Sequence, residues 1–256
     1  MKALYLHPFT NYGFYRLFSE ENSQSIFLDF LNSLPIFSSL ALKKINIIPK
    51  EELPLSAAVK STITHFHAIN QANEHVIIAI QKAQLNFFKN LNGFFNDFPI
   101  WENPDSAIQF SSENISHIYC IGVLDFVFSE NRVNPEYIYS QNCFPEIEVC
   151  SSSAHKIPYT FCYLEFPKFH LSADVLNSKL DIWLYLLKHL ESMKEIPLSM
   201  QTPVFQRVFE IMDLGALTKD EMWAYEMSLK VFRDWNNIYQ STYENALNQA
   251  RASHGK

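Results

Sequence analysis

The sequence predicts an α/β core followed by a helical extension, and two observations support this fold class. Up to about Lys168, short β-prone runs alternate with segments of helical periodicity. Beyond Pro167, the apolar residues follow only the spacing of amphipathic helices. We therefore predict a core at residues 1–170 and a helical extension at residues 171–256 that packs on it.

The first helical pattern lies in YGFYRLFSEENSQSIFLDFLNSL, where apolar residues recur three and four positions apart. Asn22 and Ser23 interrupt this pattern with residues that favour helix starts. We predict two short helices here, the second opened by a new N-cap.

A β-hairpin is the next predicted feature. LKKINIIP is predicted to be a short strand closed by Pro49, followed by a hairpin with strands at residues 65–69 and 75–81. An antiparallel pairing around this turn places His65 across from Ala79 and His67 across from Ile77, all on one face. His75 is expected on the other face. Residues 83–98 follow with a helical pattern that is crowded with aromatic side chains.

Three further strands and three helices complete the prediction. ISHIYCIGVLDFVF is nearly continuously apolar, as in a strand buried on both faces, and PEYIYSQNCFPEIEV and YTFCYLEFPKF are two more strands. DVLNSKLDIWLYLLKHL, PVFQRVFEIMDL and the segment from Thr218 onward are amphipathic helices. Thr218 and Glu221 have the spacing of a capping box. The carboxy-terminal helix NALNQARASHGK is predicted to be a surface tail whose end is disordered.

The composition excludes two classes of site. Only 5 glycines occur in 256 residues, and neither GxGxxG nor GxxxxGK is present, so no nucleotide-phosphate loop is predicted. The four cysteines form no CxxC pair, which excludes a zinc knuckle or a thiol redox motif. They are Cys120, Cys143, Cys150 and Cys162. Cys162 lies in an apolar run and is predicted to be a buried, reduced thiol.

Charge and hydropathy constrain the partners and the location. A net charge of −7 provides no global attraction to nucleic acid, which clustered Lys and Arg side chains would supply. Pro8 and polar residues interrupt the N-terminal segment where a signal peptide would be apolar. No apolar run approaches the roughly 18–20 residues of a membrane span. These features predict a cytoplasmic protein without membrane contact.

Six segments, in order, resemble those of the PD-(D/E)XK nuclease family of transposases, specifically the Rpn-type recombination-promoting nucleases. The segments are FYRLFSEENSQSIFLDFLNSL, IIAIQKAQLNFFKNLNGFFNDFPI, HIYCIGVLDFVF, CYLEFPKF, LDIWLYLLKHL and YEMSLKVFRDWNN. The resemblance implies a restriction-endonuclease-like PD-(D/E)XK core, in which helices flank a central mixed sheet. It also implies a Mg²⁺-dependent DNA endonuclease of a bacterial mobile element.

The same resemblance implies a specific metal site. In such nucleases, an Asp on the first hairpin strand and a Glu on the second together hold a divalent cation, which activates a water molecule. The Asp position falls on His65 and the Glu position on Ala79, whereas Gln81 retains the family residue. Because alanine cannot hold a metal, we predict that this copy binds none, uses no cofactor and is catalytically inactive.

Other family positions are also replaced. The Asp-Arg pair that the family carries in the helix after the hairpin falls on Asn90 and Leu91. The acidic and basic residues near the start of the first helix fall on Asn11 and Tyr15. Both replacements remove charges that a nuclease site would use.

Carboxylates elsewhere could have taken over the metal. Asp125 could be such a relocated ligand, although the family carries the same acidic residue and a structural role is favoured. Glu165 and Lys168 match a family motif and are interpreted as a strand-end contact. Glu52 and Glu74 are near the site in sequence but are expected in loops.

Imidazoles and basic side chains offer further alternatives. His65 and His67 could hold a transition metal, yet no third ligand lies near them in sequence. Gln81, Lys82 and Lys89 are the candidate nucleic-acid contacts, although the lysines are sparse enough to be solvated faces. The aromatic run FFKNLNGFF could stack on bases but is favoured as core.

Three functional hypotheses follow. The favoured one is a catalytically inactive nuclease-like protein that contacts DNA at most weakly. The second is an active endonuclease whose metal ligands have moved. The third is a protein-interaction module without nucleic-acid contact, which fits the net charge of −7. The oligomeric state remains open.

Overall fold

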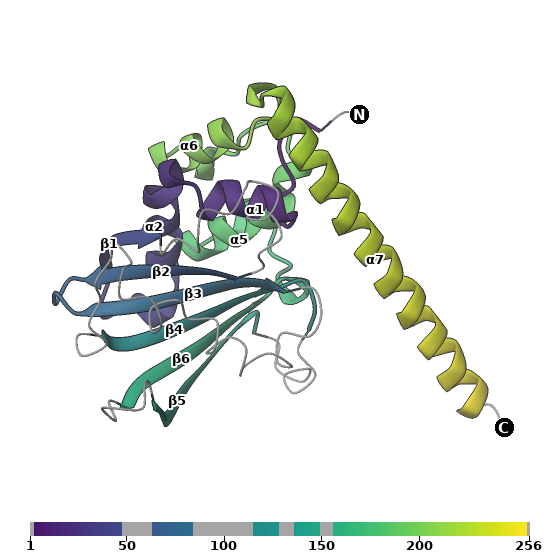
Figure 1. Ribbon diagram of the computed structural model, residues 1–256. Coiled ribbons are helices and arrows are strands. Elements are labelled where there is room, and N and C mark those ends of the chain that lie inside the picture. Colours follow the sequence, from purple (N-terminus) through teal and green to yellow (C-terminus); the bar gives the residue numbers. More distant parts are fainter. Residues whose placement is uncertain (1–2, 48–62, 84–114, 128–135, 149–155, 255–256) are drawn as a thin grey trace.

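The computed structural model describes residues 3–47, 63–83, 115–127, 136–148 and 156–254 (Figure 1). Their centre is a six-stranded mixed sheet in the order β1-β2-β3-β4-β6-β5. The strands are β1 (Leu42–Ile47), β2 (Ile63–Asn70), β3 (His75–Ala83), β4 (Ile115–Leu124), β5 (Ile138–Glu148) and β6 (Lys156–Glu165). β3, β4 and β6 are parallel, whereas β1, β2 and β5 run antiparallel to their neighbours. The predicted α/β class with a mixed sheet is confirmed.

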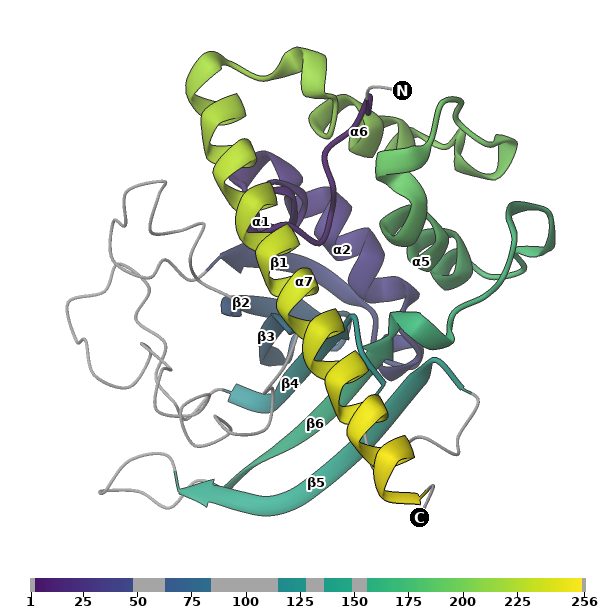
Figure 2. The same cartoon turned by 90° about the vertical axis from the view of Figure 1, so that its right-hand side faces the viewer.

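Helices gather on one face of this sheet (Figures 1 and 2). The longer ones are α1 (Asn11–Phe18), α2 (Gln24–Ser33), α5 (Lys179–His189), α6 (Pro203–Ile211) and α7 (Lys219–His254). The first four cover the sheet, and α7 begins beside them and extends past the strand ends. None of the helices within the described ranges combines the length and apolar character needed to cross a membrane.

Alternation along the hairpin explains which sheet face the helices cover. Phe66, Ala68, Val76, Ile78 and Ile80 are buried in the same apolar cluster as the helix side chains. In this cluster the ring of Phe27 lies 4.3 Å from that of Phe66, between ring centroids. The cluster also includes Trp183 of α5 and Phe205 of α6, whose ring centroids are 4.9 Å apart. The hydrophobic core therefore continues across residue 170.

The predicted break between the first two helices is confirmed, and Ser23 occupies the N-cap position of α2, but its side chain makes no capping hydrogen bond. A short 3-10 turn, Glu21–Ser23, separates α1 from α2. The hydroxyl of Ser23 donates to the carbonyl of Glu20 at 2.7 Å and therefore does not cap α2. The Ser23 side chain therefore bonds within the local turn and not to the N–H groups at the start of α2.

Two capping boxes begin the later helices. The backbone N–H of Thr218 donates to Glu221 Oε2 at 2.8 Å, and the N–H of Glu221 donates to Thr218 Oγ1 at 3.3 Å, as predicted. Ser178 and Asp181 form the second box, which opens α5. At the other end, α7 stays helical to His254, so the predicted tail is helix over most of its length.

Gly13 allows a close approach of the N-terminal segment to α1. A Cβ atom added at Gly13 would lie 2.2 Å from the carbonyl oxygen of His7, which is backbone and cannot rotate away. Gly13→Ala should therefore lower the free energy of unfolding by about 1–3 kcal/mol, as overpacking does, when measured by urea denaturation. Gly215→Ala is the matched control, because its Cβ would lie 3.2 Å from a movable carboxylate oxygen of Asp213. Equal stability of the two variants would contradict this prediction.

Candidate functional site

The β2–β3 hairpin pairs in the predicted register. His65 is the Cα partner of Ala79, and His67 is the partner of Ile77. Both pairs lie on the sheet face opposite the helices, because the helix-side cluster takes the alternate residues of each strand. The two positions onto which the resemblance places the metal ligands are thus neighbours across the hairpin.

This part of the sheet is buried and largely apolar. His65 and Ala79 are 1% and 0% exposed. Along the sheet, Ala79 pairs with Cys120, which in turn pairs with Phe161, and both are buried. The methyl group of Ala79 offers no ligand atom, and imidazole is a poor ligand for Mg²⁺, which prefers oxygen.

These side chains do not fit the Mg²⁺ that the fold family implies. Within the described ranges, no group of three or more His, Cys, Asp or Glu side chains is placed to hold a metal ion. At the two positions onto which the resemblance places the ligands, a methyl group and an imidazole provide no pair of oxygen atoms for such an ion.

The expected orientation of His75 is wrong. Its Nδ1 lies 2.9 Å from Nε2 of His67, within hydrogen-bonding distance, so both rings share one face. The reason is the strand period: His75 precedes Ile77 by two residues and therefore points to the same side. Burial lowers the pKa of His67 to about 4, and the neighbouring charges of His75 and Lys44 act in the same direction.

Glu74 lies at the hairpin turn, away from the His65–Ala79 pair. Its carboxylate accepts a hydrogen bond from the side-chain amide of Asn70 at 2.7 Å, and its N–H donates to the amide oxygen of Asn70 at 2.9 Å. Asn73 adopts a φ of 65° at this turn, a conformation that asparagine tolerates. Glu74 therefore shapes the turn, as its expected loop position indicated.

Of the three predicted nucleic-acid contacts, Gln81 and Lys82 lie in β3, within the described residues. Gln81 pairs through its backbone with Ile63 and Gly122. Lys82 is buried, and its ammonium donates to the carbonyl of Phe9 on the helix side. Burial lowers the pKa of Lys82 to about 8, partly opposed by the charge of Asp125. Lys89, Asn90, Leu91, Glu52 and the FFKNLNGFF run lie outside the described residues.

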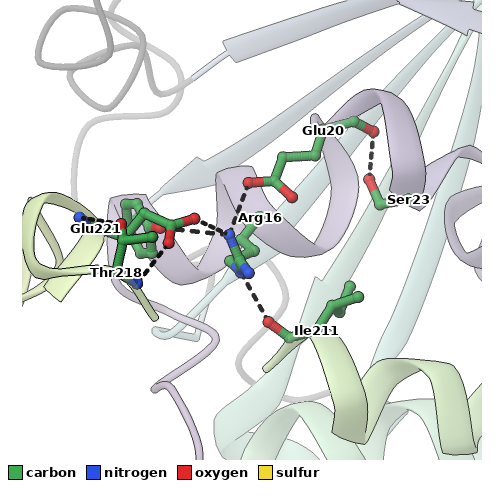
Figure 3. Close-up of polar contacts among 7 residues, drawn as sticks. Arg16, Glu20, Ser23, Ile211, Thr218 and Glu221 are labelled. Atoms are coloured by element: carbon green, nitrogen blue, oxygen red, sulfur yellow. Dashed lines mark hydrogen bonds and ion pairs between the residues drawn. The ribbon is translucent and has the colours of Figure 1, made fainter. Parts of the chain in front are cut away.

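A polar cluster that sequence patterns missed surrounds Arg16 (Figure 3). Its Nε donates to the carbonyl of Ile211 at 2.8 Å, and its Nη1 lies 2.6 Å from Glu221 and 3.2 Å from Glu20. The guanidinium thus joins α1 to the end of α6 and the start of α7. In the sequence, the four-residue spacing between Arg16 and Glu20 is the pattern that indicates one ion pair of this cluster. Asn11 and Tyr15, the replaced family positions, are half-buried on the same helix.

The carboxylates at the strand ends are Glu165, which pairs with a lysine, and Asp125. Glu165 at the end of β6 is fully buried and lies 2.5 Å from the ammonium of Lys168, which confirms the predicted strand-end contact. Asp125 follows β4 and is half-buried. Cys162 is a free, buried cysteine as predicted, and burial raises the pKa of its thiol to about 12.

Comparison with known proteins identifies the family. The family model of the PD-(D/E)XK nuclease family transposases matches residues 8–242. Neither the search of curated proteins nor that of solved structures gave a match. The matched range includes the β2–β3 hairpin, the parallel strands β3, β4 and β6, and most of α7. The chain belongs to the PD-(D/E)XK nuclease family of transposases.

Proposed function

We propose that this protein keeps the fold of its nuclease family but does not hydrolyse DNA. The observation that carries the proposal is the pairing of His65 with Ala79 at the positions of the two metal-binding carboxylates. Without those oxygens, the hairpin has no ligand pair to hold a divalent cation and no means to lower the pKa of an attacking water.

The surroundings of the pair support the same proposal. The nearest side chains along the sheet, Cys120 and Phe161, do not supply the missing oxygens. Glu165 is engaged with Lys168 at 2.5 Å, so moving it to a metal would leave a buried ammonium without its ion partner. A relocated site that used Glu165 would therefore require rearrangement of this ion pair.

DNA is the partner that family membership suggests, and we propose that the contact is weak. A chain of net charge −7 releases few counterions from DNA. Lys82, one of the three predicted contacts, is buried against the carbonyl of Phe9. Any binding should therefore be weak and should depend only shallowly on salt concentration. Within the family, we assign the chain to the recombination-promoting nucleases of the Rpn type.

Restoring both carboxylates should restore metal binding. We expect Mn²⁺ or Mg²⁺ to raise the melting temperature of the His65→Asp/Ala79→Glu variant but not that of the natural protein. Metal at 100 times its dissociation constant would add about 2.7 kcal/mol to the stability. The uncharged His65→Asn/Ala79→Gln variant is the matched control, because it has similar bulk without the charge.

Plasmid nicking with Mg²⁺ or Mn²⁺ tests the activity in the same proteins. We expect no cleavage by the natural protein and cleavage by the His65→Asp/Ala79→Glu variant. A variant that binds Mn²⁺ without cutting would support the loss of the metal site and indicate that the Leu91 position or DNA binding itself has also decayed. Chelator-sensitive cleavage by the natural protein would overturn the proposal and favour relocated ligands.

A further inference from the structure

Helix α7 offers a surface that the proposed function does not use. It runs for 36 residues, which corresponds to about 54 Å. One face is held against the body: the hydroxyl of Tyr225 accepts from the N–H of His7 at 3.2 Å, and that of Ser228 accepts from the N–H of Tyr12 at 2.9 Å. Farther along, α7 leaves the body (Figures 1 and 2).

A row of large apolar side chains lies on another side of α7. We call it the α7 stripe; it consists of Trp223, Met227, Val231, Trp235 and Ile238. Spacings of four, four, four and three residues place these side chains on one broad side of the helix, about 110° around the axis from the body-facing side. They are between 42% and 61% exposed.

The stripe is concentrated rather than scattered. Nine large apolar side chains are exposed in the part of the chain that the structure describes, and five of them belong to the stripe. Taking roughly 250 Å² for a whole Trp and 160–190 Å² for the others, their exposed area amounts to about 500 Å². Two such stripes would together bury about 1,000 Å², the lower size of a specific protein interface.

The shape of the stripe matches a second copy of itself. It is about 23 Å long and follows the i, i+4 row, which is inclined to the helix axis, so a crossing helix of similar length covers it best. In an antiparallel pair with its twofold axis at Val231, Met227 of one copy lies beside Trp235 of the other. Trp223 then lies beside Ile238, and each large ring meets a smaller side chain. A parallel pair would instead set Trp against Trp and Val against Val, which leaves uneven gaps.

Charge along the edge of the stripe fits the antiparallel arrangement. Glu226, Lys230 and Asp234 are the charged residues that follow one edge of the stripe. An antiparallel pair brings this edge against its own counterpart, so Lys230 of each copy lies near Asp234 of the other. We propose that two copies of this chain associate antiparallel through the α7 stripe, whether or not the hairpin site cleaves DNA.

Measurement of mass in solution tests this proposal. Sedimentation of the full chain between about 1 and 100 μM should show a dimer, since micromolar affinity is common for interfaces of this size. Val231→Glu should weaken the dimer at least tenfold, because two carboxylates then face each other at the twofold axis. Leu198→Glu, at an exposed apolar residue away from α7, is the matched control and should keep the dimer. A natural protein that stays monomeric would overturn the proposal.

Mixing variants tests the axis and the direction of the pair. Val231→Glu and Val231→Lys chains should each be monomeric alone and should dimerise when mixed. A Met227→Cys chain should cross-link to a Trp235→Cys chain but not to itself, because only an antiparallel pair brings these positions together. Cross-linking of Met227→Cys with itself would overturn the antiparallel arrangement. If Val231→Glu changed only binding to lipid vesicles or to another protein, the stripe would not be a dimer surface.

Discussion

Arg16→Met should lower the free energy of unfolding by about 2–4 kcal/mol, because it breaks a largely buried ion-pair cluster. The Arg16 side chain is 14% exposed and serves Glu20, Glu221 and the carbonyl of Ile211 (Figure 3). Methionine fills much of the same space but donates no hydrogen bond. The two carboxylates would then face each other without a cation, and the carbonyl would lose its donor.

Urea denaturation of three variants separates this effect from the loss of any arginine. Arg207→Met is the matched control, because Arg207 is about half exposed and pairs with Glu210 at 2.8 Å on the surface. That surface pair should contribute less than about 1 kcal/mol. Adding Glu221→Gln to Arg16→Met should recover part of the loss, since it removes one of the uncompensated charges. Equal losses from Arg16→Met and Arg207→Met would refute the role assigned to the cluster.

The sequence predicted what depends on neighbours along the chain. The hairpin register followed from two β-prone runs and the polar turn between them, and that was enough to place His65 beside Ala79. The Thr218 capping box followed equally from a three-residue spacing. The predicted orientation of His75 was wrong for a local reason. The two-residue period of the strand already places His75 on the same face as Ile77, and no long-range contact is needed to explain its position.

Contacts between distant segments account for the rest. Lysine is usually a surface residue. The ammonium of Lys82 nevertheless donates to the carbonyl of Phe9, 73 positions earlier, because the N-terminal segment folds over the sheet. Arg16 meets Glu221 across 205 positions. No periodicity encodes such pairs, because they arise only when α1, α6 and α7 are packed together. The α7 stripe could have been read from its spacing, but its exposure depends on how much of the helix the body covers.

Acidification should destabilise the fold well before its carboxylates are protonated. Burial, helped by the charges of Lys82 and Arg233, lowers the pKa of His7 to about 4 from the ordinary value of 6.5. Burial likewise lowers the pKa of His67 to about 4. Between pH 6.5 and pH 4.5, the unfolded chain therefore binds protons at both rings and the folded chain does not. Stability falls as the pH falls through this window, by about 2–3 kcal/mol for each histidine.

The local contacts of His7 explain why its ring stays neutral. Its Nδ1 accepts the N–H of Phe9 at 3.1 Å, a bond that protonation of this nitrogen would remove. Glu191 lies 3.7 Å from Nε2 and would favour the proton, but its carboxylate is more than a third exposed, so water screens it. The burial and the two nearby cations therefore outweigh the single acidic neighbour.

Urea titrations at pH 6.5, 5.5 and 4.5 measure this loss. His7→Phe and His67→Phe should each flatten the dependence of stability on pH, whatever they do to stability at pH 6.5. His170→Gln, at an exposed histidine, is the matched control and should keep the full dependence. A natural protein equally stable at pH 6.5 and pH 4.5 would show that both rings accept protons in the folded state. In that case the segment around His7 would have to open to water below pH 6, because a charged ring packed beside Lys82 and Arg233 would lack compensation.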